Sequence, residues 1–79
     1  MTDKLKPGEY RAYTLEKGLS VEDSVINAVD QFRQWAGEIP KIAQLNLRHE
    51  TLGINLSDIG VKVEYRRAVT PGMVMLGNG

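Results

Sequence analysis

One stretch of this chain, SVEDSVINAVDQFRQWAG at residues 20–37, decides the fold. Its apolar residues recur at steps of three and four, which is typical of one face of a helix. Ser20 suits the N-cap, because its hydroxyl can accept a hydrogen bond from an unpaired N–H of the first turn. Gly37 suits the left-handed residue that ends a helix, and Pro40 cannot continue one. We therefore predict a central helix over about residues 20–36.

The helix needs something to pack against. Four of its apolar residues are β-branched and are indifferent helix formers; these are Val21, Val25, Ile26 and Val29. Packing of the apolar stripe must therefore stabilise this helix, and a sheet is the expected partner.

Four stretches around the helix alternate or are rich in strand-forming residues. They are residues 9–15, 41–47, 61–66 and 73–76, and we predict a strand in each. The last two are expected to pair as a hairpin, because Thr70-Pro71-Gly72 between them is typical of a turn. Residues 48–60 have no clear pattern. A single helical turn closed by Gly53 is one interpretation of their first half.

The order β-α-β-β-β predicts an α+β fold, a two-layer sandwich with one central helix on a four-stranded mixed sheet. With 79 residues the chain is expected to be one small domain, with flexible ends at residues 1–8 and 77–79. One helix covers only one face of such a sheet, so we expect the other face to be open. On that face we expect Arg11, Tyr13, Ile42, Gln44, Lys62, Glu64 and Arg66, with Val74 and Leu76 as further candidates.

Composition excludes several classes of function. Ten basic residues balance ten acidic ones, whereas a protein that binds nucleic acid or anionic membrane by bulk attraction is normally basic. No apolar run approaches the roughly 20 residues that span a bilayer. The chain has no cysteine, and small secreted domains usually need disulfides. We therefore expect a cytoplasmic protein that is not held by a membrane.

Catalytic and metal chemistry have little support in the residue types. There is one histidine and no cysteine, whereas a structural zinc site needs four such ligands. Ser20 is already explained as a helix cap, and no nucleophile, base and orienter occur in a recognisable pattern. We predict no metal, no cofactor and no catalytic residue, and we favour a protein that is not an enzyme.

Seven residues remain as candidates for a binding surface. They are Arg48, His49, Glu50, Arg66, Arg67, Met73 and Met75. Methionine packs adaptably at contact surfaces. Our leading hypothesis is an interaction and oligomerisation module that uses the open sheet face and the strand at residues 73–76. Its expected partners are a second copy of the chain, as a dimer, another protein, or both.

Two alternatives stay open. The first is a ligand-binding protein or small enzyme with a site at a subunit interface, where His49, Glu50 and Arg66 converge from two chains. The second is weak nucleic-acid binding through a basic patch of Arg48, Arg66 and Arg67. Adjacent arginines at a strand end are also typical of a solvated edge that prevents aggregation.

Overall fold

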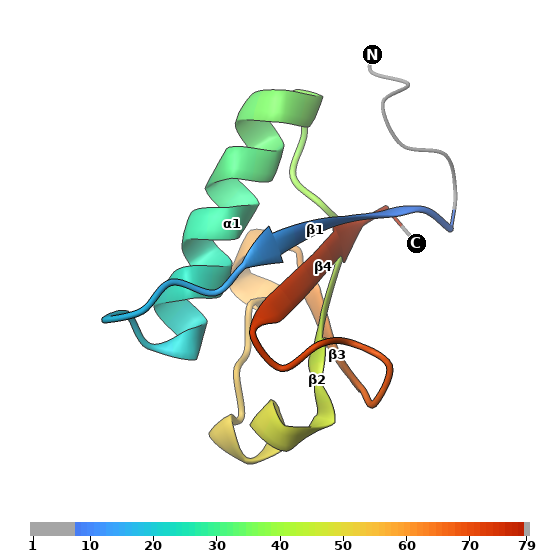
Figure 1. Cartoon of the computed structure of the whole chain (residues 1–79). Coiled ribbons are helices and arrows are strands. Elements are labelled where there is room, and N and C mark those ends of the chain that lie inside the picture. The colour runs from blue at the N-terminus through green and yellow to red at the C-terminus, as the bar shows by residue number, and fades with distance from the viewer. Residues whose placement is uncertain (1–7, 79) are drawn as a thin grey trace.

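A single helix packs on a four-stranded mixed sheet in the computed structural model, which describes residues 8–78 (Figure 1). The main elements in chain order are β1 (Tyr10–Thr14), α1 (Val21–Ala36), β2 (Ile42–Asn46), β3 (Lys62–Arg66) and β4 (Met73–Gly77). Two short 3-10 helices, η1 (Leu47–Leu52) and η2 (Ser57–Ile59), lie between β2 and β3. The predicted two-layer α+β fold and the order β-α-β-β-β are confirmed.

The ends of α1 follow from local sequence signals. The Ser20 hydroxyl accepts a hydrogen bond from the Asp23 N–H at 3.1 Å. At the other end Gly37 has a φ of 81° and donates its N–H to the Arg33 carbonyl at 2.8 Å. Both caps were predicted. The apolar stripe is narrower than predicted, because Ile26 is 45 % exposed.

The core lies between this stripe and one face of the sheet. Its buried side chains on the helix and the two inner strands are Val25, Ala28, Val29, Phe32, Ala36, Ala43, Leu45, Val74 and Leu76. The irregular connection between β2 and β3 adds Ile54 and Leu56 to the core. The side chains of residues 54 and 56 therefore pack beneath this connection.

The strand order is β1-β4-β2-β3, so β4 lies inside the sheet. It pairs antiparallel with β1 on one side and with β2 on the other, while β2 and β3 are parallel. Figure 1 shows β4 directly beside β1. The predicted hairpin between the third and fourth strands is therefore wrong. Gly77, predicted to belong to a flexible end, is the buried last residue of β4.

The β3–β4 loop (residues 67–72) must pass the end of β2, because β2 separates the two strands that it joins. Side chains from that end hold it in place. The Asn46 amide donates to the Val69 carbonyl at 2.7 Å. The His49 ring lies with Nε2 2.9 Å from the Pro71 carbonyl, a contact in which Nε2–H donates.

The two faces of β1 and β4 are the reverse of the prediction. Arg11 lies on the helix side, with its guanidinium 4.2 Å from the centre of the Trp35 ring. Tyr13 packs against the core, and Val74 and Leu76 are fully buried. Because side chains alternate along a strand, residues 10, 12 and 14 of β1 and 73 and 75 of β4 lie on the opposite face.

Candidate functional site

The sheet face that α1 leaves uncovered, called the open face below, is apolar in its middle and charged at one edge. Apart from that charged edge, the face is formed largely by apolar residues of β1, β4 and β2, namely Tyr10, Ala12, Met73, Met75 and Ile42. The edge strand β3 contributes Lys62, Glu64 and Arg66. An apolar surface bounded by polar groups is a feature of binding sites.

The open face is hollowed at one place. A depression of about 520 Å³, called the sheet-face hollow below, has contributions from all four strands and from the β3–β4 loop. The strands contribute Ala12, Gln44, Arg66, Met73 and Met75, and the loop contributes Ala68, Val69 and Thr70. Its apolar lining with a few polar groups is the usual character of a binding pocket.

The loop wall of the hollow is fixed by two hydrogen bonds, one of them from Asn46, which does not line the hollow. Val69 is 7 % exposed and anchors the loop, and its carbonyl accepts the hydrogen bond from Asn46. Thr70 accepts a hydrogen bond from the Met73 N–H at 2.9 Å, which closes the turn that leads into β4. The wall is thus held at both of its ends, which favours a preformed hollow.

Glu64 organises the polar side of the hollow. Its Oε1 accepts hydrogen bonds from the Gln44 amide at 3.1 Å and from Arg66 at 3.4 Å. Lys62 Nζ lies 3.6 Å from Oε2, and the Glu64 side chain is only 20 % exposed. The Gln44 hydrogen bond, followed by Arg66 and Lys62, lowers the pKa of Glu64. Glu64 is therefore ionised at neutral pH and orients two side chains that line the hollow.

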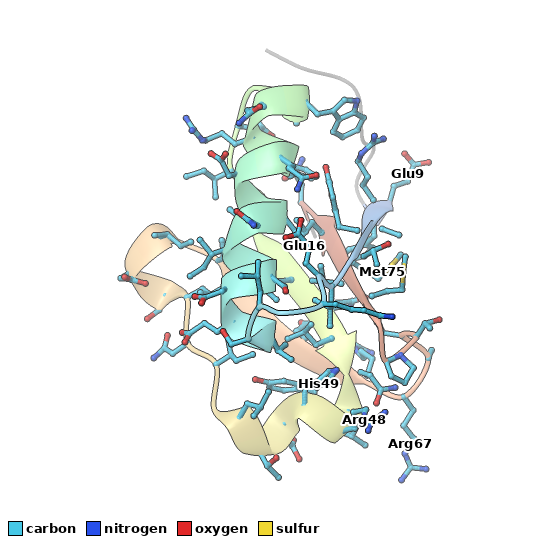
Figure 2. The ribbon with its side chains drawn as sticks, turned by 60° about the vertical axis from the view of Figure 1, so that its left-hand side comes forward. Glu9, Glu16, Arg48, His49, Arg67 and Met75 are labelled. Carbon is cyan, nitrogen blue, oxygen red and sulfur yellow. The ribbon has the colours of Figure 1, made fainter. Side chains whose placement is uncertain are left out.

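Three of the seven predicted site residues, Arg66, Met73 and Met75, line the hollow. His49 instead contacts the β3–β4 loop through its bond to Pro71. Figure 2 shows Arg48, His49 and Arg67 at the end of the molecule formed by η1, with Met75 further along the sheet.

Arg48 and Glu50 have local roles in η1. The Arg48 N–H donates to the Asn46 side-chain oxygen at 2.9 Å, and the Glu50 carbonyl accepts the Gly53 N–H at 3.2 Å. Both side chains are exposed. The geometry shows no convergence of Glu50 with the hollow within one chain.

Sequence reasoning missed most of the lining. Gln44 was expected on the open face but was not singled out, and alternation along its strand was the signal for it. Ala12, Ala68, Val69 and Thr70 carry no chemical signal of their own. They line the hollow only because the strand order brings β1 and the β3–β4 loop together.

Within residues 8–78 no three His, Cys, Asp or Glu side chains gather closely enough to hold a metal ion. No helix in the same range is long and apolar enough to cross a membrane. The fold and the hollow define a small two-layer α+β domain with a partly apolar open face. Comparisons with models of known families, with curated proteins and with solved structures found no match to this chain.

Proposed function

We propose that this chain is a non-enzymatic protein-interaction module that receives an apolar side chain of a partner protein in the sheet-face hollow. The observation that carries this proposal is the hollow itself, an apolar depression on a sheet face that no element among residues 8–78 covers. Met73 and Met75 line it, and unbranched methionine side chains adapt to differently shaped partners.

The charges beside the hollow favour an acidic partner. Lys62 and Arg66 have side chains that are 73 % and 59 % exposed, and Arg67 is exposed at the start of the loop. Glu64 offsets one of these three positive charges. An acidic side chain next to the apolar one would complement this edge, which supports a partner segment of that chemistry.

The open face is large enough for such a partner. An interface of standard size removes about 800 Å² from each protein, which is about a sixth of the accessible surface of 5049 Å². The proposal keeps the cytoplasmic location that a chain without cysteine favours.

A displayed peptide library selected against the chain tests the partner chemistry. Peptides that combine an apolar residue with a neighbouring acidic residue are expected to be enriched. Adding a synthetic peptide of that kind to protein labelled in its methionine methyl groups should shift the signals of Met73 and Met75. The variants Met75→Lys and Arg66→Glu should each weaken binding at least tenfold.

Leu52→Lys is the matched control, because Leu52 is an exposed apolar residue, 55 % accessible, outside the hollow. It should bind like the unmodified chain. Enrichment of basic peptides, or equal binding by the Met75→Lys and Leu52→Lys variants, would overturn the proposal. Met73 and Met75 methyl signals that do not respond to the peptide at any concentration of the chain would also overturn it.

The two alternatives have weaker support. A site centred on His49 would need its ring free, whereas Nε2 is engaged with the Pro71 carbonyl. Nucleic-acid binding through Arg48, Arg66 and Arg67 would rely on an arginine, Arg66, that already contacts Glu64.

A further inference from the structure

The outer edge of β1 is exposed and lacks the features that protect most edge strands. β1 lies at one end of the sheet and has no strand on its outer side within residues 8–78. A mostly polar depression of about 410 Å³ lies between β1 and α1, so the helix does not close over this edge. Native edge strands are usually protected by charges, proline or bulges.

The two edges of the sheet differ in this respect. β3, at the other end, carries Lys62, Glu64 and Arg66. β1 contains no proline and one charged residue, Arg11, whose guanidinium lies over the Trp35 ring. Charge therefore protects the β3 edge, whereas the β1 edge is chemically suited to pair with another strand.

The ladder with β4 shows which backbone groups of β1 point outward. The Leu15 N–H donates to the Gly72 carbonyl at 2.9 Å, which continues the register of the β1–β4 pair. Backbone groups in an antiparallel ladder alternate between the two sides of a strand. Those of residues 11 and 13 therefore point toward β4, and those of Tyr10, Ala12 and Thr14 point to the free edge.

We propose that β1 pairs antiparallel with β1 of a second copy of this chain, about a two-fold axis at Ala12. This register places Ala12 opposite Ala12 of the second copy and Tyr10 opposite its Thr14. All three outward residues then form hydrogen-bonded pairs, with about six backbone hydrogen bonds between the copies.

The side chains agree with this register. Small Ala12 side chains meet at the axis without crowding, and each Tyr10 faces a Thr14, an aromatic and β-branched pair that stabilises antiparallel strands. On the helix side each Arg11 faces a Tyr13, a pairing that a cation–π contact favours. Each copy carries one Arg11 in β1, and this register does not place the two directly opposite each other.

The pairing extends the proposed function without depending on it. A two-fold axis perpendicular to the sheet keeps both open faces on the same side, forming one sheet of twice four strands. Ala12 lies at the axis and also lines the sheet-face hollow, so the two hollows adjoin. The dimer would then offer two neighbouring sites to one partner, which raises apparent affinity by multivalency.

Single cysteines test the register directly, because the chain has none of its own. The Ala12 α-carbons of two copies would be about 5.5 Å apart, whereas two Thr14 or two Tyr10 would be separated by about 14 Å along the strand. Ala12→Cys should therefore cross-link to a dimer with a short bis-maleimide. Thr14→Cys and Tyr10→Cys should cross-link poorly alone and efficiently when mixed.

Sedimentation of variants with an altered edge gives an independent measurement. Thr14→Lys places a charge on the edge, and Ala12→Pro removes an N–H that points away from β4. Both should be monomeric at concentrations where the unmodified chain is a dimer, and circular dichroism should show that at least one of them is folded. Arg66→Glu, at the opposite edge of the sheet, should remain a dimer.

Either a monomeric unmodified chain or equal cross-linking of Thr14→Cys alone and in the mixture would overturn the pairing. Those results would leave the peptide experiment unaffected. Loss of peptide binding with intact Ala12→Cys cross-linking would instead remove the proposed function and keep the dimer.

Discussion

Replacing Asn46 should loosen the wall of the sheet-face hollow without touching its lining. Asn46 is the last residue of β2, and its side chain makes two contacts. The amide N–H donates to the Val69 carbonyl at 2.7 Å, and the amide oxygen accepts the Arg48 N–H at 2.9 Å. One side chain therefore holds the β3–β4 loop and caps the start of η1.

The magnitude follows from these two contacts. A hydrogen bond contributes a net of about 0.5–1.5 kcal/mol, and loss of an N-cap costs about 0.5–2 kcal/mol. Asn46→Ala should therefore lower the free energy of unfolding by about 1–3 kcal/mol. The total for a 79-residue chain is about 4–12 kcal/mol. A loss of ~2 kcal/mol would lower Tm by about 8–16 °C in a domain of this size.

Asn46→Asp separates the two contacts. The carboxylate still accepts the Arg48 N–H, but it has no hydrogen to donate and leaves the Val69 carbonyl without its partner. Asn46→Asp should therefore destabilise the chain at pH 7. The difference in free energy of unfolding between this variant and the unmodified chain should shrink as the pH falls through the ordinary Asp pKa of about 3.9. A protonated carboxyl can again donate a hydrogen bond to the Val69 carbonyl.

Urea unfolding followed by fluorescence of Trp35, the one tryptophan, measures these differences. Asn55→Ala is the matched control, because the Asn55 side-chain oxygen accepts the Ser57 N–H at 2.9 Å in the same local arrangement. If Asn46→Ala lowers the free energy of unfolding by no more than Asn55→Ala does, the role of Asn46 in holding the loop is refuted. In the methyl spectrum, Asn46→Ala should also shift Met73, which follows the loop.

Two further predictions concern the open face. Gly77→Ala should destabilise the chain by about 1–3 kcal/mol, because an added Cβ would lie 2.6 Å from a ring carbon of Tyr10. Thermal unfolding measures this loss. The control is Gly72→Ala, because no such atom lies within 4 Å of a Cβ added at Gly72. The Gln44 hydrogen bond holds the pKa of Glu64 below its ordinary value of 4.5, so this group stabilises the fold above pH 4.5 and the contribution is lost as the pH falls through the lowered pKa. Glu64→Gln should therefore show a smaller loss of stability below pH 4.5 in urea unfolding, and an unchanged acid profile would contradict the inference.

The helix and the strands could be predicted because their signals are local. Ser20 and Gly37 act within one turn of the residues that they cap. The strands follow from alternation, and their observed ends differ from the predicted ones by at most one residue. None of these signals depends on which segment lies beside which.

The position of β4 could not be predicted, because strand pairing depends on contacts between distant segments. Thr70-Pro71-Gly72 predicted a turn correctly, but a turn does not show whether the next strand pairs with its neighbour or passes it. The pairing of β2 with β4 joins residues about 30 positions apart, such as Ile42 and Gly77. The Asn46 hydrogen bond to Val69 accompanies this arrangement, and an asparagine at a strand end is too common to indicate it.

The core-facing side of β1 could not be predicted for the same reason. Tyr10 and Tyr13 place an aromatic ring on each face, so alternation alone does not identify the core side. Contacts with distant residues determine which side of β1 faces the helix, since Tyr10 lies opposite Gly77 and Arg11 lies over Trp35. Amphipathic side chains such as arginine can cover apolar surface while keeping their charge in water.

The strand order also determines how the two proposed activities are related. With β4 inside the sheet, the two edge strands are β1, which carries one charged residue, and β3, which carries three. Three strand spacings of about 4.8 Å separate them by about 14 Å, beyond the 7–10 Å over which substitutions usually couple. Thr14→Lys and Arg66→Glu should therefore act independently. Thr14→Lys should weaken dimerisation by the same free energy whether or not Arg66→Glu is present. A different loss in the double variant would show that the β1 edge and the β3 edge form a single site.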